Sequence, residues 1–422
     1  MVKAKLVLDL GNSETRAVLR VGDIRDKSRM EHSFNLSNRF GVVLESLPIT
    51  EDYNETNTTA LTIDELKIGE GSLPAGTYVN GLMSDREFAN MQIRPTALNP
   101  KYNSDVTILT VVTAVKTSAL WMREYFKSKG QEHELETLIN QIDWELALLL
   151  PPSQVNEGTK KLTEALVKEI PVTFELPKAT ACIRITKVEV FAEGTSAYMA
   201  VLVKKSNKGV RANKAFMTKA KVLIIDIGAG TTDIILIDNN TAVETSKYTI
   251  DQGGNNIMQK LKQKTQIQVG AKLADSVFED AVITGKVKQG IKEHDVTQLL
   301  INSKREVAMV ISNEIRGYLE SSNLSVNSVD YILVVGGGSM KSKNSDVPAI
   351  SKYILEGLKR FAPHIGEIDI EDMTEVSEQV GFGADSEDNV SRRDLNIVGT
   401  GVMLDLKELR EIKKEEEAKA NA

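Results

Sequence analysis

The sequence predicts an α/β protein made of two similar halves, each containing a sheet covered by helices. An apolar stretch that ends in Asp9-Leu10-Gly11 recurs as Asp226-Ile227-Gly228, so that equivalent residues lie 217 positions apart. Strand-like and helix-like hydrophobic spacing alternate along the chain, which favours sheets covered by helices. At 422 residues the chain is also longer than one hydrophobic core usually serves.

Bulk composition narrows the possible functions. Hydrophobic residues make up 41% of the chain and charged residues 26%, as is usual for a globular protein. The net charge of −7 repels a phosphate backbone, so we expect no direct nucleic-acid binding. One polar segment, which we interpret as a solvated loop, gathers the basic residues Lys204, Lys205, Lys208, Arg211 and Lys214.

The cellular compartment is predicted from the cysteines and from the apolar runs. Cys182 is the only cysteine, which excludes an intrachain disulfide and favours a reducing compartment, and four histidines make a zinc site improbable. The first strand begins too close to Met1 for a secretory leader, and no apolar run comes near the ~20 residues that span a bilayer. We therefore expect a cytoplasmic protein without membrane contact.

The first half is expected to open with a hairpin. Residues 5–10 have the apolar pattern of a strand, turn at Gly11 and continue as a second strand over 16–19. Residues 51–103 are polar and rich in glycine and proline, which predicts an inserted segment. Helical spacing follows over 106–127, Asp143 is interpreted as part of a helix end, and 147–150 and 183–191 are predicted strands. The second strand leads into Ala192-Glu193-Gly194 and a helix from Thr195.

The second half is expected to repeat this plan. A strand over 222–227 returns through 241–250, and Gly253-Gly254 forms a turn before a helix at 257–261. Residues 262–328 are mostly helical in pattern, and a strand over 331–335 ends in a glycine turn. The last organised element covers 394–404, and residues 406–420 predict a solvated helix rich in Glu and Lys.

The duplicated turns have the composition of phosphate-binding loops. Glycine lets backbone amides face a ligand, and short hydroxyl and amide side chains donate further hydrogen bonds to phosphate oxygens. The candidate nucleotide-binding residues are Asp9, Gly11, Asn12 and Ser13 in the first turn, Asp226, Gly228, Ala229, Gly230, Thr231 and Thr232 in the second, and Gly336, Gly337, Gly338 and Ser339 in a third. One such turn is common on protein surfaces, but three turns after apolar strands predict a nucleotide site.

Asp9 and Asp226 would repel phosphate unless a divalent cation lay between them and the ligand. Mg²⁺ prefers one or two carboxylates together with water and phosphate oxygens, so both residues are candidate metal ligands, directly or through water. The sequences G-x-x-x-x-G-K-[ST] and G-x-G-x-x-G are absent, which excludes a P-loop enzyme and a dinucleotide-binding fingerprint.

These turns resemble the two phosphate loops and the adenosine loop of the ATPase superfamily that contains actin, heat-shock chaperones and sugar kinases. Residues 396–401, Asn-Ile-Val-Gly-Thr-Gly, resemble its second connecting helix. The resemblance implies an actin-like, ribonuclease H-like fold of two domains around a nucleotide. The first domain would cover 1–217, with an insert at about 36–103 and completion by 393–422, and the second would cover 218–392, with an insert at about 262–320. Asn12-Ser13-Glu14 departs from the family pattern because it has no second glycine.

Within this superfamily the resemblance is strongest to the plasmid-segregation actins of the ParM type. Val190-Phe191-Ala192-Glu193 is similar to their Val-x-x-Glu junction, which implies that Glu193 is catalytic and orients the water that attacks the γ-phosphate. The alternative is a carboxylate that only stabilises the first turn of the next helix. The sequence does not distinguish Lys304, Arg305 and Glu306 as adenine contacts.

The resemblance implies an ATPase that uses ATP and Mg²⁺, polymerises head to tail into filaments and segregates plasmid DNA through a DNA-binding adaptor. The sequence does not distinguish ATP from GTP as the bound nucleotide. The alternatives are a small-molecule kinase, for which Asp143 is the one candidate base, a chaperone-type ATPase, and a membrane-associated actin relative. The chaperone is disfavoured because no substrate-binding domain follows the last motif, and the membrane-associated relative because neither end of the chain shows an apolar anchor.

Overall fold

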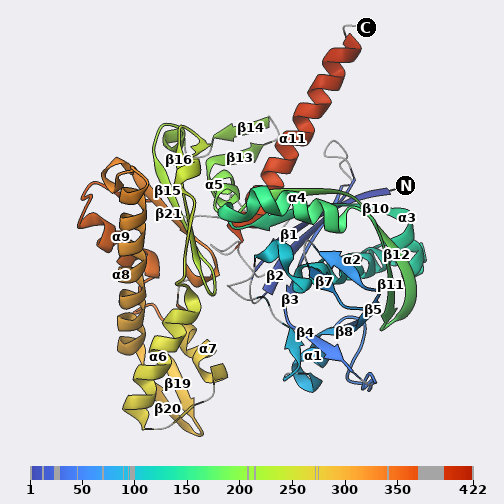
Figure 1. Ribbon diagram of the computed structural model, residues 1–422, viewed down its shortest axis with the longest axis horizontal. Helices are drawn as coiled ribbons and strands as arrows, with labels where there is room; N and C mark the ends of the chain where they lie inside the picture. The colour runs from blue at the N-terminus through green and yellow to red at the C-terminus, as the bar shows by residue number, and fades with distance from the viewer. Residues whose placement is uncertain are drawn as a thin grey trace.

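The structure is a computed structural model that describes residues 2–11, 14–22, 29–44, 46–68, 71–88, 90–93, 95, 100–206, 209–212, 215–270, 272–273, 275–339, 342–368 and 394–420. Four residues singled out above, Asn12, Ser13, Lys208 and Lys214, lie outside the described residues. The chain forms two lobes that lie side by side, each with its own sheet (Figure 1).

Ten strands form the first sheet, in the order β3-β2-β1-β10-β12-β11-β5-β8-β4-β9. The central strands β1, β10 and β12 run parallel, whereas β2 and β11 join them as antiparallel neighbours. The strands are Val2–Leu10 (β1), Glu14–Val21 (β2), Met30–Ser37 (β3), Phe40–Val43 (β4), Thr58–Ile63 (β5), Gly76–Gly81 (β8), Gln92–Ile93 (β9), Ile142–Leu150 (β10), Glu169–Glu175 (β11) and Lys178–Ala192 (β12).

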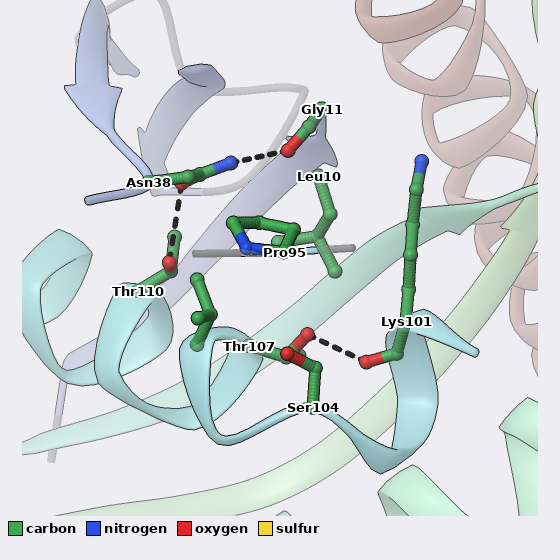
Figure 2. A pocket seen from close by; sticks show the side chains of 9 residues that line it. Leu10, Gly11, Asn38, Pro95, Lys101, Ser104, Thr107 and Thr110 are labelled. Atoms are coloured by element: carbon green, nitrogen blue, oxygen red, sulfur yellow. Dashed lines mark hydrogen bonds between the residues drawn. The ribbon is translucent and has the colours of Figure 1, made fainter. Parts of the chain in front are cut away.

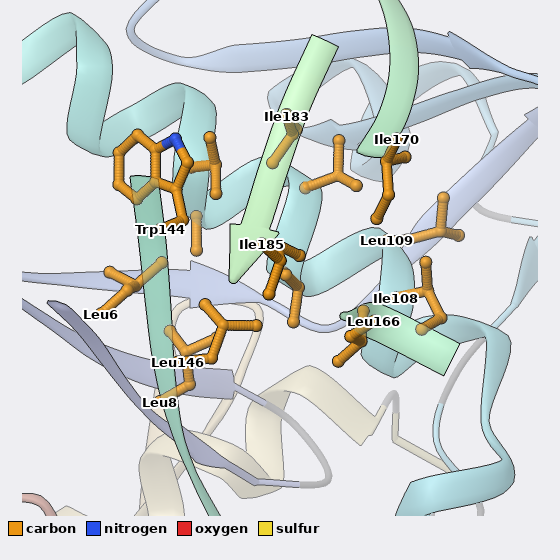
Figure 3. Close-up of a cluster of buried hydrophobic side chains, with 14 of the residues drawn as sticks. Leu6, Leu8, Ile108, Leu109, Trp144, Leu146, Leu166, Ile170, Ile183 and Ile185 are labelled. Carbon is orange, nitrogen blue, oxygen red and sulfur yellow. The ribbon is translucent and has the colours of Figure 1, made fainter. Parts of the chain in front are cut away.

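The central strands are apolar on both faces because each face carries a hydrophobic core. Successive residues of a strand point to opposite sides, so Leu6 and Leu8 of β1 join the core that contains α2 (Asp105–Ser128), whereas Val7 joins the core on the other face. Figure 3 shows part of the first of these cores, with side chains from β1, β10, β12 and α2 in one cluster and Trp144 at its edge.

The helix α2 differs from the sequence-based expectation that no apolar run could span a bilayer. By length and composition alone it is apolar enough to do so. However, 83% of its most apolar window is buried inside the protein, which is the burial of a core helix. The helix reaches this hydropathy because its Val, Ile, Leu and Ala residues outweigh the Thr and charged residues among them.

The second sheet has the order β17-β16-β15-β21-β22, and β18 also pairs with β16. β15 and β21 run parallel at its centre, and β15 and β16 form the second copy of the opening hairpin. The strands are Val222–Ile227 (β15), Thr232–Asp238 (β16), Thr241–Ala242 (β17), Tyr248–Ile250 (β18), Tyr331–Val335 (β21) and Gly366–Glu367 (β22).

The outer face of the second sheet is covered by the helices of that lobe. Leu223 and Ile225 of β15 share a core with α8 and α9. The remaining described elements are Leu66–Ile68 (β6), Gly71–Leu73 (β7), Val203–Ser206 (β13), Gly209–Ala212 (β14), Lys286–Gln289 (β19), Lys292–Asp295 (β20), Leu82–Glu87 (α1), Leu135–Gln141 (α3), Val155–Leu166 (α4), Gly254–Val269 (α6), Asp275–Thr284 (α7), Thr297–Ser321 (α8) and Ile350–Lys359 (α9).

Two helices between the lobes join them through a shared core. This core takes Val7 and Leu149 from the first sheet and Ile224 and Leu333 from the second, together with residues of α5 (Thr195–Leu202) and α11 (Leu395–Ala420). The two helices approach very closely, since a Cβ on Gly399 of α11 would lie 1.6 Å from the carbonyl oxygen of Ser196. The two lobes therefore contact each other through the packed helices α5 and α11, in addition to being linked by the chain.

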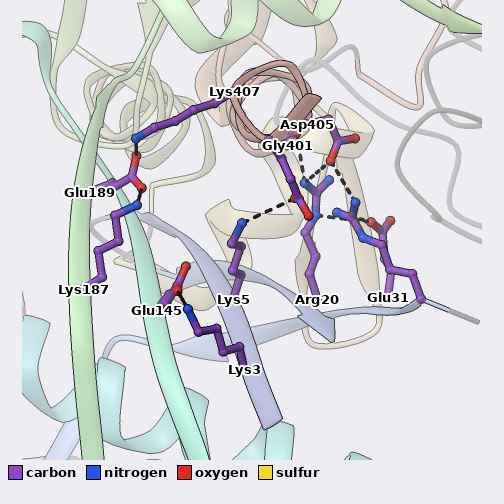
Figure 4. A network of polar contacts seen from close by, with 12 residues as sticks. Lys3, Lys5, Arg20, Glu31, Glu145, Lys187, Glu189, Gly401, Asp405 and Lys407 are labelled. Carbon is purple, nitrogen blue, oxygen red and sulfur yellow. Dashed lines mark hydrogen bonds and ion pairs between the residues drawn. The ribbon is translucent and has the colours of Figure 1, made fainter. Parts of the chain in front are cut away.

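Ion pairs fix α11 against the first sheet (Figure 4). Arg20 of β2 is 3% exposed and donates to the carbonyl oxygen of Gly401 at 3.0 Å and to Asp405 at 3.3 Å. Further along the helix, Lys407 contacts Glu189 of β12 at 2.6 Å. The helix continues without a break from residue 395 to 420, so the elements predicted at 394–404 and 406–420 are one helix.

The structure adds detail to one predicted segment and corrects the description of another. Within 36–103, strands β4, β5, β8 and β9 continue the first sheet through the pairing of β5 with β11, so this segment extends the sheet. Asp143 lies in β10, paired with Arg184 at 2.6 Å, and not at a helix end. The prediction failed there because α3 passes directly into β10 at residues 141 and 142, without a glycine or proline between them.

Candidate functional site

The two duplicated turns bring their aspartates into one cluster at the junction of the lobes. Asp9 stands near the end of β1, and Asp226 stands in β15, one residue before its end. Burial is the main cause that raises the pKa of both carboxyls to about 7, and the charge of Asp226 also raises the pKa of Asp9. The charge of Asp226 in the second lobe therefore acts on Asp9 in the first.

Two further carboxylates complete this cluster. Glu193 follows β12 and is 6% exposed, and Asp233 of β16 is also 6% exposed. Burial, with the charge of Glu193 next in size, raises the pKa of Asp233 to about 7. Thr249 donates a hydrogen bond to Asp233 at 2.5 Å, which acts in the opposite direction. Four acidic groups therefore lie near one another, three of them buried and Asp9 half-buried.

Lys101 supplies a positive charge to the four carboxylates. Its Nζ lies 2.6 Å from an Oε1 of Glu193. Burial alone would lower the pKa of this lysine, but the negative charges of Glu193 and Asp9 outweigh that effect and raise it. One ammonium group cannot balance four carboxyl groups, and repulsion from Glu193 adds to burial in raising the pKa of Asp9, Asp226 and Asp233.

The backbone of the β12–α5 junction fixes the position of Glu193. Its N–H donates to the carbonyl oxygen of Leu150 at 2.9 Å, which ties it to the end of the neighbouring parallel strand β10. Gly194 follows with a φ of +74°, a conformation that disfavours any side chain, and a Cβ there would also press on Ile224 at 3.4 Å. Helix α5 then begins at Thr195, so the carboxylate stands at a strand-to-helix junction, as the sequence predicts.

Asn396, at the start of α11, links the two lobes at this cluster. Its side-chain Nδ2 donates to Asp226 of the second lobe at 2.6 Å, and its Oδ1 accepts from the backbone N–H of Gly194 in the first lobe at 2.8 Å. The hydrogen bond to the carboxylate favours its charged form and lowers the pKa of Asp226 against the larger effect of burial.

Gly253 and Gly254 pack against the backbone of the second turn. The N–H of Gly254 donates to the carbonyl oxygen of Gly228 at 3.0 Å, and a Cβ on Gly253 would lie 2.7 Å from the carbonyl oxygen of Ala229. Thr232 is fully buried, and its hydroxyl donates to the carbonyl oxygen of Gln252 at 2.7 Å, so this proton is already used inside the protein. Thr231 and Gly230 remain partly exposed in the turn.

The third turn packs directly against the second. Gly336 has a φ of +87°, and a Cβ on it would lie 2.2 Å from Oδ1 of Asp226, so no larger residue fits. A Cβ on Gly338 would lie 2.8 Å from the carbonyl oxygen of Gly228. Ser339 is fully buried, and its hydroxyl donates to the carbonyl oxygen of Gly336 at 2.7 Å, which closes the turn. The second and third turns therefore form one surface beside Asp226.

The first turn borders a small pocket (Figure 2). Gly11 lies at its edge, and a Cβ there would lie 2.4 Å from the carbonyl oxygen of Glu14, so the turn requires glycine. Lys101 lines the same pocket. Thr107 donates to the carbonyl oxygen of Lys101 at 2.6 Å and so fixes the short helix Lys101–Asn103 that carries the lysine.

The charge of this cluster fits a bound cation, although no preformed metal site is present. Among the described residues, no group of three or more His, Cys, Asp or Glu side chains is arranged to hold a metal by itself. Mg²⁺ is commonly bound through few protein carboxylates and completed by water and phosphate. The surplus of buried negative charge around Asp9 and Asp226 is compatible with such a partly hydrated cation.

Sequence reasoning had no means of finding Lys101 and Asn396. Lys101 lies in the polar segment before α2, where nothing in its neighbours distinguishes it from a solvated lysine. Asn396 falls within a recognised motif, but only its position in space shows that it reaches Asp226. Asp233 is two residues after Thr231, and its placement beside Glu193 depends on the second hairpin pairing Asp226 with Asp233 across β15 and β16.

Comparison with known proteins identifies similar folds. Residues 224–345 match the family model described as the C-terminal part of archaeal actin homologues that are MreB-like. No curated protein matches the sequence. The structure is similar to that of the actin-like protein Alp7A, with a TM-score of 0.65, 14% sequence identity and 99% of each chain covered.

Two other solved structures carry information on ligands and assembly. Ta0583, an archaeal actin homologue solved in complex with ADP, has a TM-score of 0.57 and 18% identity over 95% of this chain and 98% of its own. ParM from Clostridium botulinum, solved within a 15-stranded filament, has a TM-score of 0.53 and 17% identity over 92% of this chain and 100% of its own.

Proposed function

We propose that this chain, which has the actin-like fold, is an ATPase that assembles into filaments. The observation that carries the proposal is the cluster of Asp9, Glu193, Asp226 and Asp233 around Lys101, at the junction of the two lobes and beside the second and third glycine turns. The ADP bound by Ta0583 and the filament formed by ParM support it, because both proteins share this fold.

The residues of the cluster have distinct roles in this proposal. Backbone amides of the glycine turns bind phosphate oxygens, and Asp9 and Asp226 hold Mg²⁺, directly or through water. Bound Mg²⁺ supplies positive charge that offsets the phosphates and the surplus carboxylates. Glu193 orients the attacking water and accepts its proton, a contribution of ~10²–10⁴ in rate.

Lys101 and Asn396 position the reacting groups. The ion pair at 2.6 Å keeps the carboxylate of Glu193 in one orientation, while Asn396 fixes the distance between the Gly194 backbone and Asp226. Because these contacts come from both lobes, nucleotide binding and the relative position of the lobes are coupled. A closed, nucleotide-bound protomer would then add head to tail to the next, and hydrolysis would loosen that contact.

Glu193 gives the most direct test of the ATPase. We expect Glu193→Gln to bind ATP and to sediment as filaments with ATP and Mg²⁺, but to release phosphate at least a hundredfold more slowly than the unmodified protein. Glu189→Gln, an ion-paired carboxylate of β12 outside the cluster, is the matched control and should release phosphate at the normal rate. Equal rates for Glu193→Gln and the unmodified protein would remove the catalytic role of Glu193.

Segregation of plasmid DNA through an adaptor is the cellular role that we propose. The net charge of −7 makes the protein a poor direct ligand for DNA, which favours a basic adaptor between filament and DNA. The test is filament sedimentation with plasmid DNA, with and without a small basic protein encoded beside this chain. Co-sedimentation of DNA that needs no second protein would contradict the adaptor.

The kinase alternative loses its candidate base in the structure. Asp143 lies seven residues before the end of β10, which puts it roughly 20 Å from the end of the strand that borders the cluster. It is also ion-paired with Arg184. A kinase would still be favoured over a filament-forming ATPase if the protein transferred phosphate to one of a panel of sugars and did not sediment as an assembly with ATP.

A further inference from the structure

Asn38 stands at the corner between β3 and β4 and reaches the first glycine turn. Its side chain is 2% exposed. Figure 2 shows its amide nitrogen directed at the carbonyl oxygen of Gly11, to which it donates a hydrogen bond. On the other side of the amide, Oδ1 accepts hydrogen bonds from the hydroxyls of Thr15 at 2.9 Å and Thr110 at 3.2 Å.

These contacts connect three elements that are far apart in the sequence. Gly11 and Thr15 flank the turn between β1 and β2, Thr110 belongs to α2, and Asn38 itself follows β3. Thr15 and Thr110 are fully buried or nearly so. A flipped amide would set Oδ1 against the Gly11 carbonyl oxygen, two acceptors with no proton between them, so the donor of the amide is directed at Gly11.

The corner that carries Asn38 is itself fixed from behind. Asn80 of β8 donates to the carbonyl oxygens of both Ser37 and Arg39, at 2.7 Å and 3.0 Å. Ser84 of α1 also donates to the carbonyl oxygen of Arg39, at 3.2 Å. Asn38 therefore reaches the turn from a rigid support, which is what a residue that fixes a ligand-binding loop requires.

We propose that Asn38 is a positioning residue that fixes the carbonyl of Gly11, directly after β1, and thereby supports phosphate binding at this end of the strand. The hydrogen bond gives the Gly11 carbonyl oxygen a buried partner inside the first lobe, so that this oxygen need not face the oxygens of a bound phosphate, which are also acceptors. Asn38 does not touch the phosphate in this arrangement. The inference rests on the proposed nucleotide site and specifies what maintains its first turn.

The test compares two variants that differ in the bond to Gly11. Asn38→Ala removes all three hydrogen bonds, whereas the double variant Thr15→Val and Thr110→Val removes the two hydroxyl donors and leaves the bond to Gly11. Dissociation constants for ATP and for AMP, both with Mg²⁺, are measured for each, together with the thermal midpoint. AMP serves as the probe with few phosphate contacts.

We expect Asn38→Ala to weaken ATP binding about tenfold and AMP binding by less than twofold, since of the three lost hydrogen bonds only the one to the half-buried Gly11 carbonyl supports the phosphate site. The double variant should lose similar thermal stability but keep its ATP affinity within about twofold of the unmodified protein. Equal loss for ATP and AMP, or equal loss in both variants, would show a purely structural residue and overturn the inference. Failure of the unmodified protein to bind ATP would overturn the proposed function instead.

Discussion

At the scale of single residues, the site is dominated by the imbalance between buried acids and bases. Asp9, Asp226 and Asp233 all have pKa values raised to about 7, chiefly by burial, and Lys101 is the lysine whose charge opposes this shift at each of them. This excess of acidic groups lowers the stability of the protein without a ligand. Polar clusters of this kind are retained where a ligand later compensates them.

The ion pair between Lys101 and Glu193 predicts that removing the lysine lowers the stability of the protein. Lys101→Met should lower the free energy of unfolding by about 3 kcal/mol, because it leaves Glu193 buried without its 2.6 Å partner. Chemical denaturation measures this change. Lys101→Arg retains a positive charge and is the control, which we expect to recover most of the loss. If Lys101→Met were as stable as the unmodified protein, the cluster would not depend on this lysine.

The raised pKa of Asp233 predicts that the stability of the protein depends on pH. Its pKa is raised from 3.8 in the unfolded chain to about 7 by burial and by Glu193, against the opposing effects of Thr249 and Lys101. The folded protein therefore binds the proton more tightly, and stability from this group is full below about pH 4 and is lost as the pH rises through about 7. In EDTA, Asp233→Asn should gain in thermal midpoint relative to the unmodified protein between pH 4 and pH 7.5. A constant difference across that range would contradict the raised pKa.

At the scale of elements, the crossing of α5 and α11 sets the distance between the lobes. Gly399→Ala would put a Cβ 1.6 Å from the Ser196 carbonyl oxygen, so the helices must separate, at a cost of about 2 kcal/mol. The shift would also displace Asn396, three residues earlier on α11, and slow phosphate release. Denaturation and phosphate-release assays measure both effects.

A matched glycine provides the control for this helix crossing. Gly317 lies in α8, where an added Cβ would meet nothing within 4 Å. Gly317→Ala should therefore stabilise the protein by ~0.5–1 kcal/mol through helix propensity and leave phosphate release unchanged. If Gly399→Ala changed stability and phosphate release no more than Gly317→Ala does, the close approach of α5 and α11 would not be needed for function.

The elements that the sequence could predict are those with a strong local pattern. Strands β1 and β15 are apolar, end at glycine and occur twice, and α2 has helical spacing over its full length, so all three were foreseeable. Asp143 was placed wrongly because the chain passes from α3 into β10 without a break in composition. Lys101, Asn38 and Asn396 could not be found, since their roles come from hydrogen bonds across 92, 27 and 170 positions of the chain.

At the scale of the whole molecule, the nucleotide would act as an additional contact between the lobes. Residues of both lobes surround the cluster, and the core that contains α5 and α11 already unites them, so a ligand that binds only the folded form should stabilise both lobes together. ATP with Mg²⁺ at ~100 times its dissociation constant should add ~2.7 kcal/mol to the free energy of unfolding. Chemical denaturation followed by separate probes in each lobe measures this gain.

The first lobe carries natural fluorescence probes for this experiment, and the second lobe needs an introduced one. Trp144 and Trp121 report on the first lobe, and the second lobe has no tryptophan, so a Tyr331→Trp variant supplies its probe. With ATP and Mg²⁺ the two probes should shift together by the same free energy, whereas ATP in EDTA should produce a smaller shift because the surplus carboxylates stay uncompensated. A shift confined to one probe would mean that the ligand contacts one lobe alone, which is incompatible with a site built from Asp9 and Asp226.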